Sequence, residues 1–332
     1  MLQPVLFLQR FCSYTLWSLL LMYMRIAFLG KGGSGKTTVS SLVARVAPET
    51  FNEIFVIDSD INMHMKGALG VDDANVSPFL PIFKSYEHHI RQTHPGLEGL
   101  TSLPRTLPVW TAASQIPIRL DQKPFDGSKS TNRTAVYELG GYSEKTMGWS
   151  CHHSSLGKLQ LVLTHTKDTD DQLLIADLTA GADVFGVGML GLFDVVYVVV
   201  EPTLKSTSIF KQLRELADID DIKLTPIANK VIDQSDLDFI ETQIGIRPHH
   251  AIELSNFVRR LERGEPVTTN DIEPSIKATV LAILEGISTM NRDAGQLYAA
   301  SISSHQRAAK NWPKDKFGDV DLMTLINADY KV

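Results

Sequence analysis

The sequence predicts an α/β fold in which a doubly wound, mostly parallel sheet is flanked by helices. Short apolar runs alternate along the chain with longer segments that suit helices, which is typical of strand–helix–strand units. The run Val195–Val200 is apolar at every position, as expected for a strand that is covered on both faces. The first apolar run, residues 25–29, leads into a glycine-rich turn and a helix-compatible segment, Thr37–Ala47. Together these features predict a sheet that carries its functional loops at the carboxyl ends of its strands.

Most of the predicted strands are unbroken apolar runs that end at a glycine or a polar residue. The predicted strands are 25–29, 54–57, 159–164, 173–176, 195–200 and 224–228. Helices are predicted from about residue 36 and at 206–216, 235–243 and 276–290. Residues 71–150 contain several prolines and are predicted to form a variable, insert-like region, with Asp121–Arg133 as an exposed loop.

Composition restricts the class of protein. The chain has 332 residues, of which 43% are hydrophobic and 21% charged, which is typical of a globular protein with a sizeable core. The formal net charge of −6 argues against a protein that binds nucleic acid through bulk positive charge. Cys12 and Cys151 are the two cysteines, so a disulfide framework is excluded and a reducing, cytoplasmic compartment is expected.

The glycine-rich turn carries the strongest motif in the chain. Residues 30–38 read GKGGSGKTT and contain the phosphate-loop spacing G-x-x-x-x-G-K-T from Gly30 to Thr37. Glycines allow consecutive backbone N–H groups to converge, and the following helix adds its positive dipole end. We expect Lys36 to reach the β- and γ-phosphates and the Thr37 hydroxyl to hold Mg²⁺. The residues predicted to line the nucleotide are Gly30, Gly32, Gly33, Ser34, Gly35, Lys36, Thr37 and Thr38.

Three further strand ends carry residues that suit a nucleotide site. The run at 54–57 ends in Asp58-Ser59-Asp60, and the run at 173–176 ends at Asp177, a position typical of a carboxylate that binds Mg²⁺ through water. Gly181 would let a backbone N–H approach the γ-phosphate. The run at 224–228 ends in Asn229-Lys230, where the amide could pair with an adenine edge. The order of these strand ends strengthens the prediction of one shared site.

These motifs resemble the deviant Walker A family of dimeric ATPases that includes MinD/ParA, nitrogenase iron protein, ArsA and CooC. Lys31 follows Gly30 directly, which is the second lysine of that family's loop. Residues 58–62, DSDIN, are especially similar to the CooC maturation ATPases, residues 177–181 resemble switch II, and residues 198–203 resemble the segment after it. The resemblance covers about residues 24–285, with 71–150 poorly matched.

The resemblance implies a P-loop (SIMIBI) fold, ATP and Mg²⁺ as ligands, and a homodimer that closes across the nucleotide. Lys31 would reach the partner's nucleotide, and Asp60 would orient the attacking water. Asp58 and Asp177 would support Mg²⁺, whereas Asn229 would contact the base. Hydrolysis would proceed by in-line attack of water on the γ-phosphate.

The sequence gives weaker evidence for the molecule on which such an ATPase acts. CooC-like metallochaperones carry a Cys-x-Cys pair upstream of switch II, where this chain has Cys151-His152. One thiolate and one imidazole from each subunit would suit Zn²⁺ or Ni²⁺. A ParA/MinD-like partitioning or positioning protein and a small-molecule kinase or ligase are the alternatives. The kinase would need an acceptor pocket built from residues 71–150.

The two ends of the chain are predicted to lie outside the ATPase domain at 24–290. The leader, 1–23, includes most of the apolar stretch Tyr14–Met24, which is short for a bilayer span and lacks a following cleavage site. We expect translation to start at Met22 or Met24, with a membrane-contacting leader as the alternative. Residues 291–332 are predicted to form a polar helix with a loose end.

Overall fold

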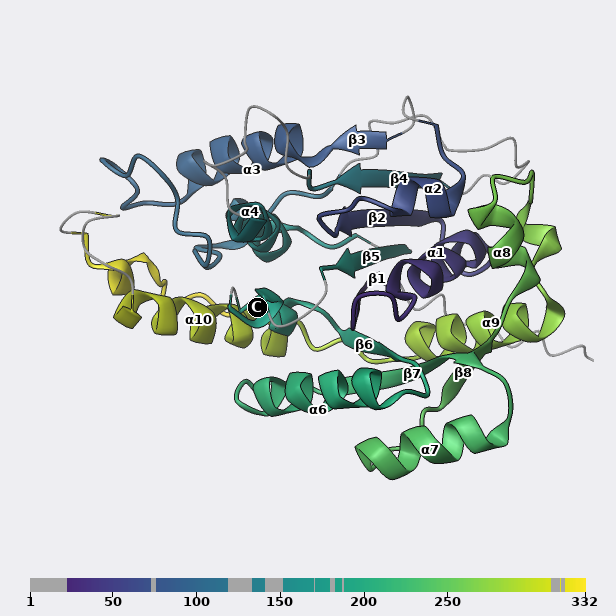
Figure 1. Ribbon diagram of the computed structural model, residues 1–332. Helices are drawn as coiled ribbons and strands as arrows, with labels where there is room; N and C mark the ends of the chain where they lie inside the picture. Colours follow the sequence, from purple (N-terminus) through teal and green to yellow (C-terminus); the bar gives the residue numbers. More distant parts are fainter. Residues whose placement is uncertain are drawn as a thin grey trace, which may run out of the picture.

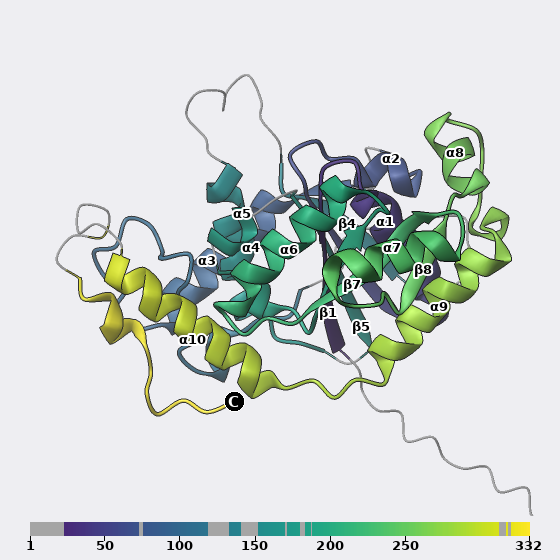
Figure 2. The same ribbon diagram turned by 60° about the horizontal axis from the view of Figure 1, so that its bottom comes forward.

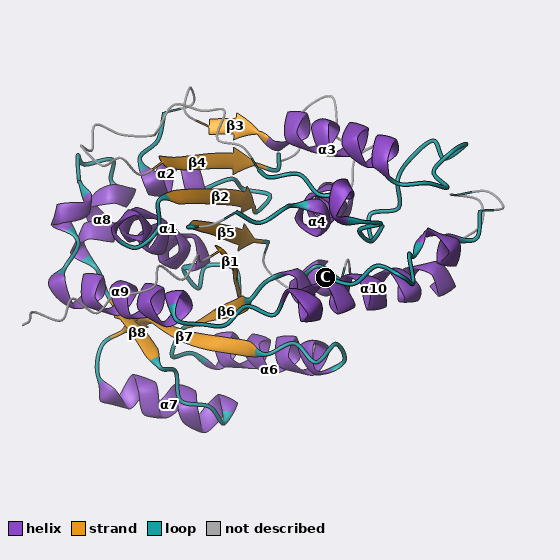
Figure 3. Ribbon diagram, turned by 180° about the vertical axis from the view of Figure 1, so that it is seen from behind, coloured by secondary structure: helices purple, strands orange, loops and turns teal. Residues whose placement is uncertain are grey.

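The computed structural model describes residues 23–72, 76–118, 133–140, 152–169, 171–179, 183–186, 188–311, 317 and 320–332. Within this part of the chain one sheet of eight strands forms the centre of the molecule, in the order β3-β4-β2-β5-β1-β6-β7-β8 (Figure 3). All neighbouring strands are parallel. The predicted α/β class and parallel sheet are therefore confirmed.

The strands are short and mostly buried, as expected for a sheet covered on both faces. Their bounds are β1 Tyr23–Gly30, β2 Glu53–Ser59, β3 Val76–Pro78, β4 Arg133–Glu138, β5 Gln172–Leu178, β6 Val195–Val200, β7 Leu224–Val231 and β8 His250–Glu253. Alternate side chains of β1 enter the two halves of the core: Ala27 and Leu29 face one layer of helices, and Ile26 and Phe28 face the other.

Two layers of helices cover the sheet (Figure 1). One layer contains α1 Lys36–Val46, α2 Met65–Leu69, α8 Asn256–Glu262 and α9 Pro274–Ser288. The other contains α3 Phe79–Thr93, α4 His152–His165, α6 Leu204–Asp218 and α7 Gln234–Ile244. The short helix α5 spans Asp183–Gly186, and α10 spans Ala294–Asn311. Figure 2 shows the turn from β1 into α1 at one end of the sheet and α10 toward the other.

The strand predicted at 159–164 is wrong, because these residues lie in α4. Successive side chains of this helix are buried, from Leu159 through His165. A helix that is buried nearly all round carries no periodicity of 3.6 residues, so a short apolar run within it cannot be told from a strand.

The segment 71–150 contributes more to the sheet than the sequence indicates. It supplies β3, α3 and β4, and β4 lies between β3 and β2 in the interior of the sheet. Neither strand was predicted, because β3 has three residues and β4 begins with two polar ones. Most of the predicted loop Asp121–Arg133 lies outside the described residues, and Arg133 is the first residue of β4.

The C-terminal segment contains the predicted helix, α10, but its end is not loose. Leu322 and Leu325 are buried in a short 3₁₀ helix, η7 (Leu322–Leu325). The ring of His305 donates to the Leu322 carbonyl at 2.8 Å, and the ring of His94 donates to the Leu325 carbonyl at 3.1 Å. Burial accounts for the lowered pKa of both histidines, which favours their neutral forms in these contacts.

The first 22 residues lie outside the described part, so the leader stays a prediction. In the described part, no helix has the length and apolar character needed to cross a bilayer.

Candidate nucleotide-binding site

The turn between β1 and α1 has the backbone of a phosphate-binding loop. Gly30, Gly33 and Gly35 have φ angles of 152°, 83° and 89°, a region that side-chain-bearing residues rarely adopt. A Cβ on Gly30 would lie 2.7 Å from the Val199 carbonyl, and one on Gly35 would lie 2.2 Å from the Asn229 amide nitrogen. Gly30 and Gly35 are therefore required both by conformation and by close packing, and Gly33 by conformation alone.

The first turn of α1 is free to receive an anion. Its N-cap is Gly35, which makes no side-chain cap, and the first turn contains no acidic residue. The leading N–H groups of a helix have no partner within the helix, and the dipole there favours negative charge. Because α1 begins at Lys36, this positive end points at the loop that the motif predicts to bind phosphate.

Both lysines of the motif lie at this loop, each beside a carboxylate. The Nζ of Lys36 is 3.6 Å from the Oδ2 of Asp60, and both side chains are nearly buried. The Nζ of Lys31 is 4.0 Å from the Oε2 of Glu201, and its side chain is 31% exposed. Lys36 is thus enclosed by the surrounding side chains, whereas Lys31 lies closer to solvent.

Two strand-end carboxyl groups lie side by side beneath the loop. β2 and β5 are neighbours, and their register pairs Asp58 with Asp177. The Thr37 hydroxyl donates to Asp177 Oδ2 at 2.6 Å, while the other carboxyl oxygen of Asp177 is buried without a hydrogen-bond partner among the described residues. Burial raises the pKa of Asp177 to about 7 and that of Asp58 to about 6.

This group suits a divalent cation that prefers oxygen ligands. The Thr37 hydroxyl and the unpaired Asp177 oxygen are oxygen ligands of the kind that such cations bind. A bound cation would also stabilise the ionised form of the carboxylate. Among the described residues no three His, Cys, Asp or Glu side chains converge as a metal cage. Mg²⁺ matches such a sparse set, because it keeps several waters and shares substrate phosphates.

Asp58 and Asp60 form an ordered turn next to these groups. Asp58 accepts hydrogen bonds from the backbone N–H of Asp60 at 3.1 Å and of Met65 at 2.9 Å. Asp60 Oδ1 accepts from the backbone and side chain of Asn62, both at 3.0 Å. The other oxygen of Asp60 faces Lys36, so Asp60 is placed at the loop as the motif predicts.

Asn229 and Lys230 hold the loop from the end of β7. The buried Asn229 amide donates to the Ser34 carbonyl at 2.8 Å, and the Lys230 ammonium donates to the Gly33 carbonyl at 2.8 Å. Lys230 does so from a left-handed backbone with φ of 59°. The predicted contact of Asn229 with a base stays a prediction.

Glu201 is a site residue that the sequence reasoning did not single out. It follows β6 directly and pairs with Lys230 at 2.6 Å as well as with Lys31. Its position as a polar residue that closes an apolar strand was the available signal. Three predicted residues cannot be placed: Gly181 and Cys151 lie outside the described residues, and the side chain of His152 is not described.

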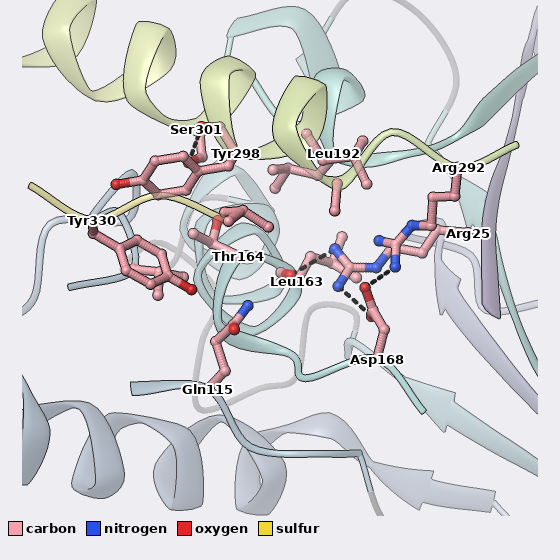
Figure 4. Close-up of a pocket in the computed structure, with 14 residues that line it drawn as sticks. Arg25, Gln115, Leu163, Thr164, Asp168, Leu192, Arg292, Tyr298, Ser301 and Tyr330 are labelled. Carbon is pink, nitrogen blue, oxygen red and sulfur yellow. Dashed lines mark hydrogen bonds and ion pairs between the residues drawn. The ribbon is translucent and has the colours of Figure 1, made fainter. Parts of the chain in front are cut away.

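A cavity lies near the start of β1, away from the phosphate loop (Figure 4). Arg25 pairs with Asp168 at 2.7 Å and donates to the Leu163 carbonyl at 2.7 Å. Arg292 pairs with Asp168 and with Asp194. The two guanidinium groups are balanced by two carboxylates, so this network ties the segment before α10 to β1 and leaves no net charge for a ligand.

Solved structures of known proteins share this fold. A ParA family ATPase from Chlorobium tepidum aligns with a TM-score of 0.51 at 14% identity, over 80% of this chain and 99% of its own. MinD from Pyrococcus horikoshii, solved with Mg-ADP, also gives a TM-score of 0.51 at 14% identity, over 81% of this chain and 97% of its own. The chain therefore has the fold of the MinD/ParA (SIMIBI) P-loop proteins.

Curated relatives are distant in sequence, but their alignments with this chain cover most of their own length. CooC, a carbon monoxide dehydrogenase accessory protein of Rhodospirillum rubrum, is 27% identical over 220 residues, which is 65% of this chain and 78% of CooC. An uncharacterised ATP-binding protein of Methanocaldococcus jannaschii is 29% identical over 229 residues, 67% of this chain and 82% of that protein. No family model matches the chain.

Proposed function

We propose that the protein is an ATP-hydrolysing molecular switch that closes as a homodimer across its nucleotide. The observation that carries this proposal is the presence of both lysines, Lys31 and Lys36, at one glycine-rich loop, with only Lys36 enclosed by its own subunit. A lysine that borders the loop but stays near solvent would be accessible to a neighbouring subunit.

Hydrolysis would depend on positioning and on neutralisation of charge. The loop N–H groups and the Lys36 ammonium would bind the β- and γ-phosphates, and Lys36 would leave Asp60 to do so. Asp60 would then be free to accept a hydrogen bond from the attacking water and to orient it. Thr37 and Asp177 would hold Mg²⁺, which neutralises phosphate charge when bound.

Exposed apolar side chains at the same edge of the sheet support a face that binds a second copy. Leu204, Ile232 and Leu254 follow β6, β7 and β8, and are 66%, 77% and 59% exposed. Large apolar side chains that cluster at one edge are typical of an interaction surface. They lie at the edge of the sheet that carries the loop, which is consistent with a partner that covers the nucleotide.

A narrower role in metal-centre maturation is favoured by the likeness to CooC and by Cys151-His152. In that role the paired subunits would hold Zn²⁺ or Ni²⁺ and release it to a client protein as ATP is hydrolysed. A partitioning or positioning switch would share the same ATPase cycle and would instead be stimulated by DNA or a membrane.

The dimer is tested with Lys31→Ala. We expect wild-type protein to form dimers with Mg²⁺ and a non-hydrolysable ATP analogue, measured by light scattering after gel filtration. Lys31→Ala should stay monomeric and lose most of its ATP turnover, while the control Lys223→Ala, at an exposed lysine before β7, should behave as wild type. Unchanged dimers and turnover in Lys31→Ala would contradict the proposal and favour a kinase or ligase.

A further inference from the structure

We propose that Glu201 is a positioning residue that holds Lys31 within its own subunit until ATP and a second subunit compete for that lysine. The proposal rests on the dimeric switch proposed above and adds its resting state. Glu201 would set how readily Lys31 becomes available in trans.

The strand order places Glu201 between the two lysines. β6 lies between β1 and β7, with Gly30 paired to Val199 and Val200 paired to Ala228. Glu201 therefore emerges beside the start of the phosphate loop on one side and beside Asn229-Lys230 on the other. Its own backbone N–H donates to the Ser206 hydroxyl at 3.0 Å, which fixes the turn into α6.

The two oxygens of Glu201 serve different lysines. Oε1 is 2.6 Å from the Nζ of Lys230, and Oε2 is 4.0 Å from the Nζ of Lys31. The Glu201 side chain is 14% exposed, compared with 44% for Lys230 and 31% for Lys31. A single carboxylate that faces two ammonium groups leaves one positive charge uncompensated at the edge of the loop.

Lys230 is held more firmly than Lys31. It pairs with Glu201 at 2.6 Å and also donates to the Gly33 carbonyl at 2.8 Å. Lys31 has the longer contact with Glu201 and otherwise donates to the neighbouring Gly32 carbonyl at 3.0 Å. Lys31 is therefore the exchangeable partner of the carboxylate.

The contact with Lys31 is weak enough to be reversed. Partly exposed ion pairs contribute little, because water and salt screen them. The triphosphate of a partner subunit carries several negative charges and would compete effectively with one carboxylate. The contact of Glu201 with Lys31 in the same subunit would thus disfavour dimer formation without nucleotide and permit it when ATP is bound.

The test is Glu201→Gln, which keeps size and removes charge. The control is Glu241→Gln on α7, which removes a carboxylate from an exposed ion pair with Arg247. We expect Glu201→Gln to lower the ATP-analogue concentration needed for half-maximal dimerisation about two- to five-fold. Labelling of the Lys31 amine in nucleotide-free protein, measured by mass spectrometry, should rise by a similar factor.

The outcomes separate this inference from the proposed function. Wild-type values for both measurements in Glu201→Gln, while Lys31→Ala abolishes dimers, would overturn the role of Glu201 alone. Weaker nucleotide binding by Glu201→Gln in a Lys31→Ala background would also overturn it, because Glu201 would then act on the loop through Lys230. Dimers that persist in Lys31→Ala would reject the switch, and Lys31 labelling would still test the contact in cis.

Discussion

The buried carboxyl group of Asp177 predicts an unusual pH dependence of stability, which the substitution Asp177→Asn should remove. Burial raises the pKa of this group from 3.8 to about 7, against the opposing effects of the Thr37 hydroxyl and the Lys36 charge. Between these values the folded protein keeps a proton that the unfolded chain has lost. The contribution of Asp177 to the stability of the folded protein is therefore fully present below about pH 4 and is lost as the pH rises through about 7.

The size of the effect follows from the two pKa values. The interval from 3.8 to about 7 corresponds to roughly 4 kcal/mol of unfolding free energy, at 1.36 kcal/mol per pH unit. We therefore compare the free energies of unfolding of Asp177→Asn and wild type. Between about pH 5.5 and about pH 8, their difference should shift by about 2 kcal/mol in favour of the variant. Asp58, whose pKa burial also raises, titrates in both proteins, so the effect of its burial cancels in the difference, whereas its electrostatic coupling to Asp177 does not.

The assay is urea unfolding of both proteins across this pH range, with a chelator and without nucleotide. The new amide leaves a buried donor unpaired, which adds a constant cost of about 1–3 kcal/mol. The slope with pH is therefore the diagnostic quantity. A difference that stays flat, or that moves in favour of wild type as pH rises, would refute the reasoning. Asp177→Asn should also lose Mg²⁺-dependent turnover.

Two further predictions concern the loop and the metal. Gly30→Ala should lower the free energy of unfolding by about 1–3 kcal/mol, because the new Cβ would lie 2.7 Å from the Val199 carbonyl. Gly32→Ala, where nothing lies within 4 Å, should change it by less than about 0.5 kcal/mol, and equal effects in urea unfolding would contradict the steric argument. If the protein carries metal for a client, purified wild type should contain Zn²⁺ or Ni²⁺ in amounts that depend on Mg-ATP, and Cys151→Ala should not. Equal metal content in both would exclude that role and leave the ATPase untouched.

The accuracy of the sequence predictions varied with the range of the interactions involved. β6 was predicted with its observed bounds, and α1 begins at the residue that the phosphate-loop motif indicates. Both depend on local signals: an unbroken apolar run and a glycine-rich turn. α4 was missed because it is buried nearly all round, and β4 because its place inside the sheet comes from pairing with β2 and β3.

By itself the sequence determined that the chain carries a phosphate-loop motif and that carboxylates follow two of its apolar runs, because these features depend on residue type and spacing. Only the tertiary structure decided that Glu201 meets both Lys31 and Lys230, that Thr37 meets Asp177, and that the C-terminal residues pack beside α3. These contacts join residues far apart in the chain. Parallel crossovers decide which strand ends become neighbours, and no local pattern encodes that order.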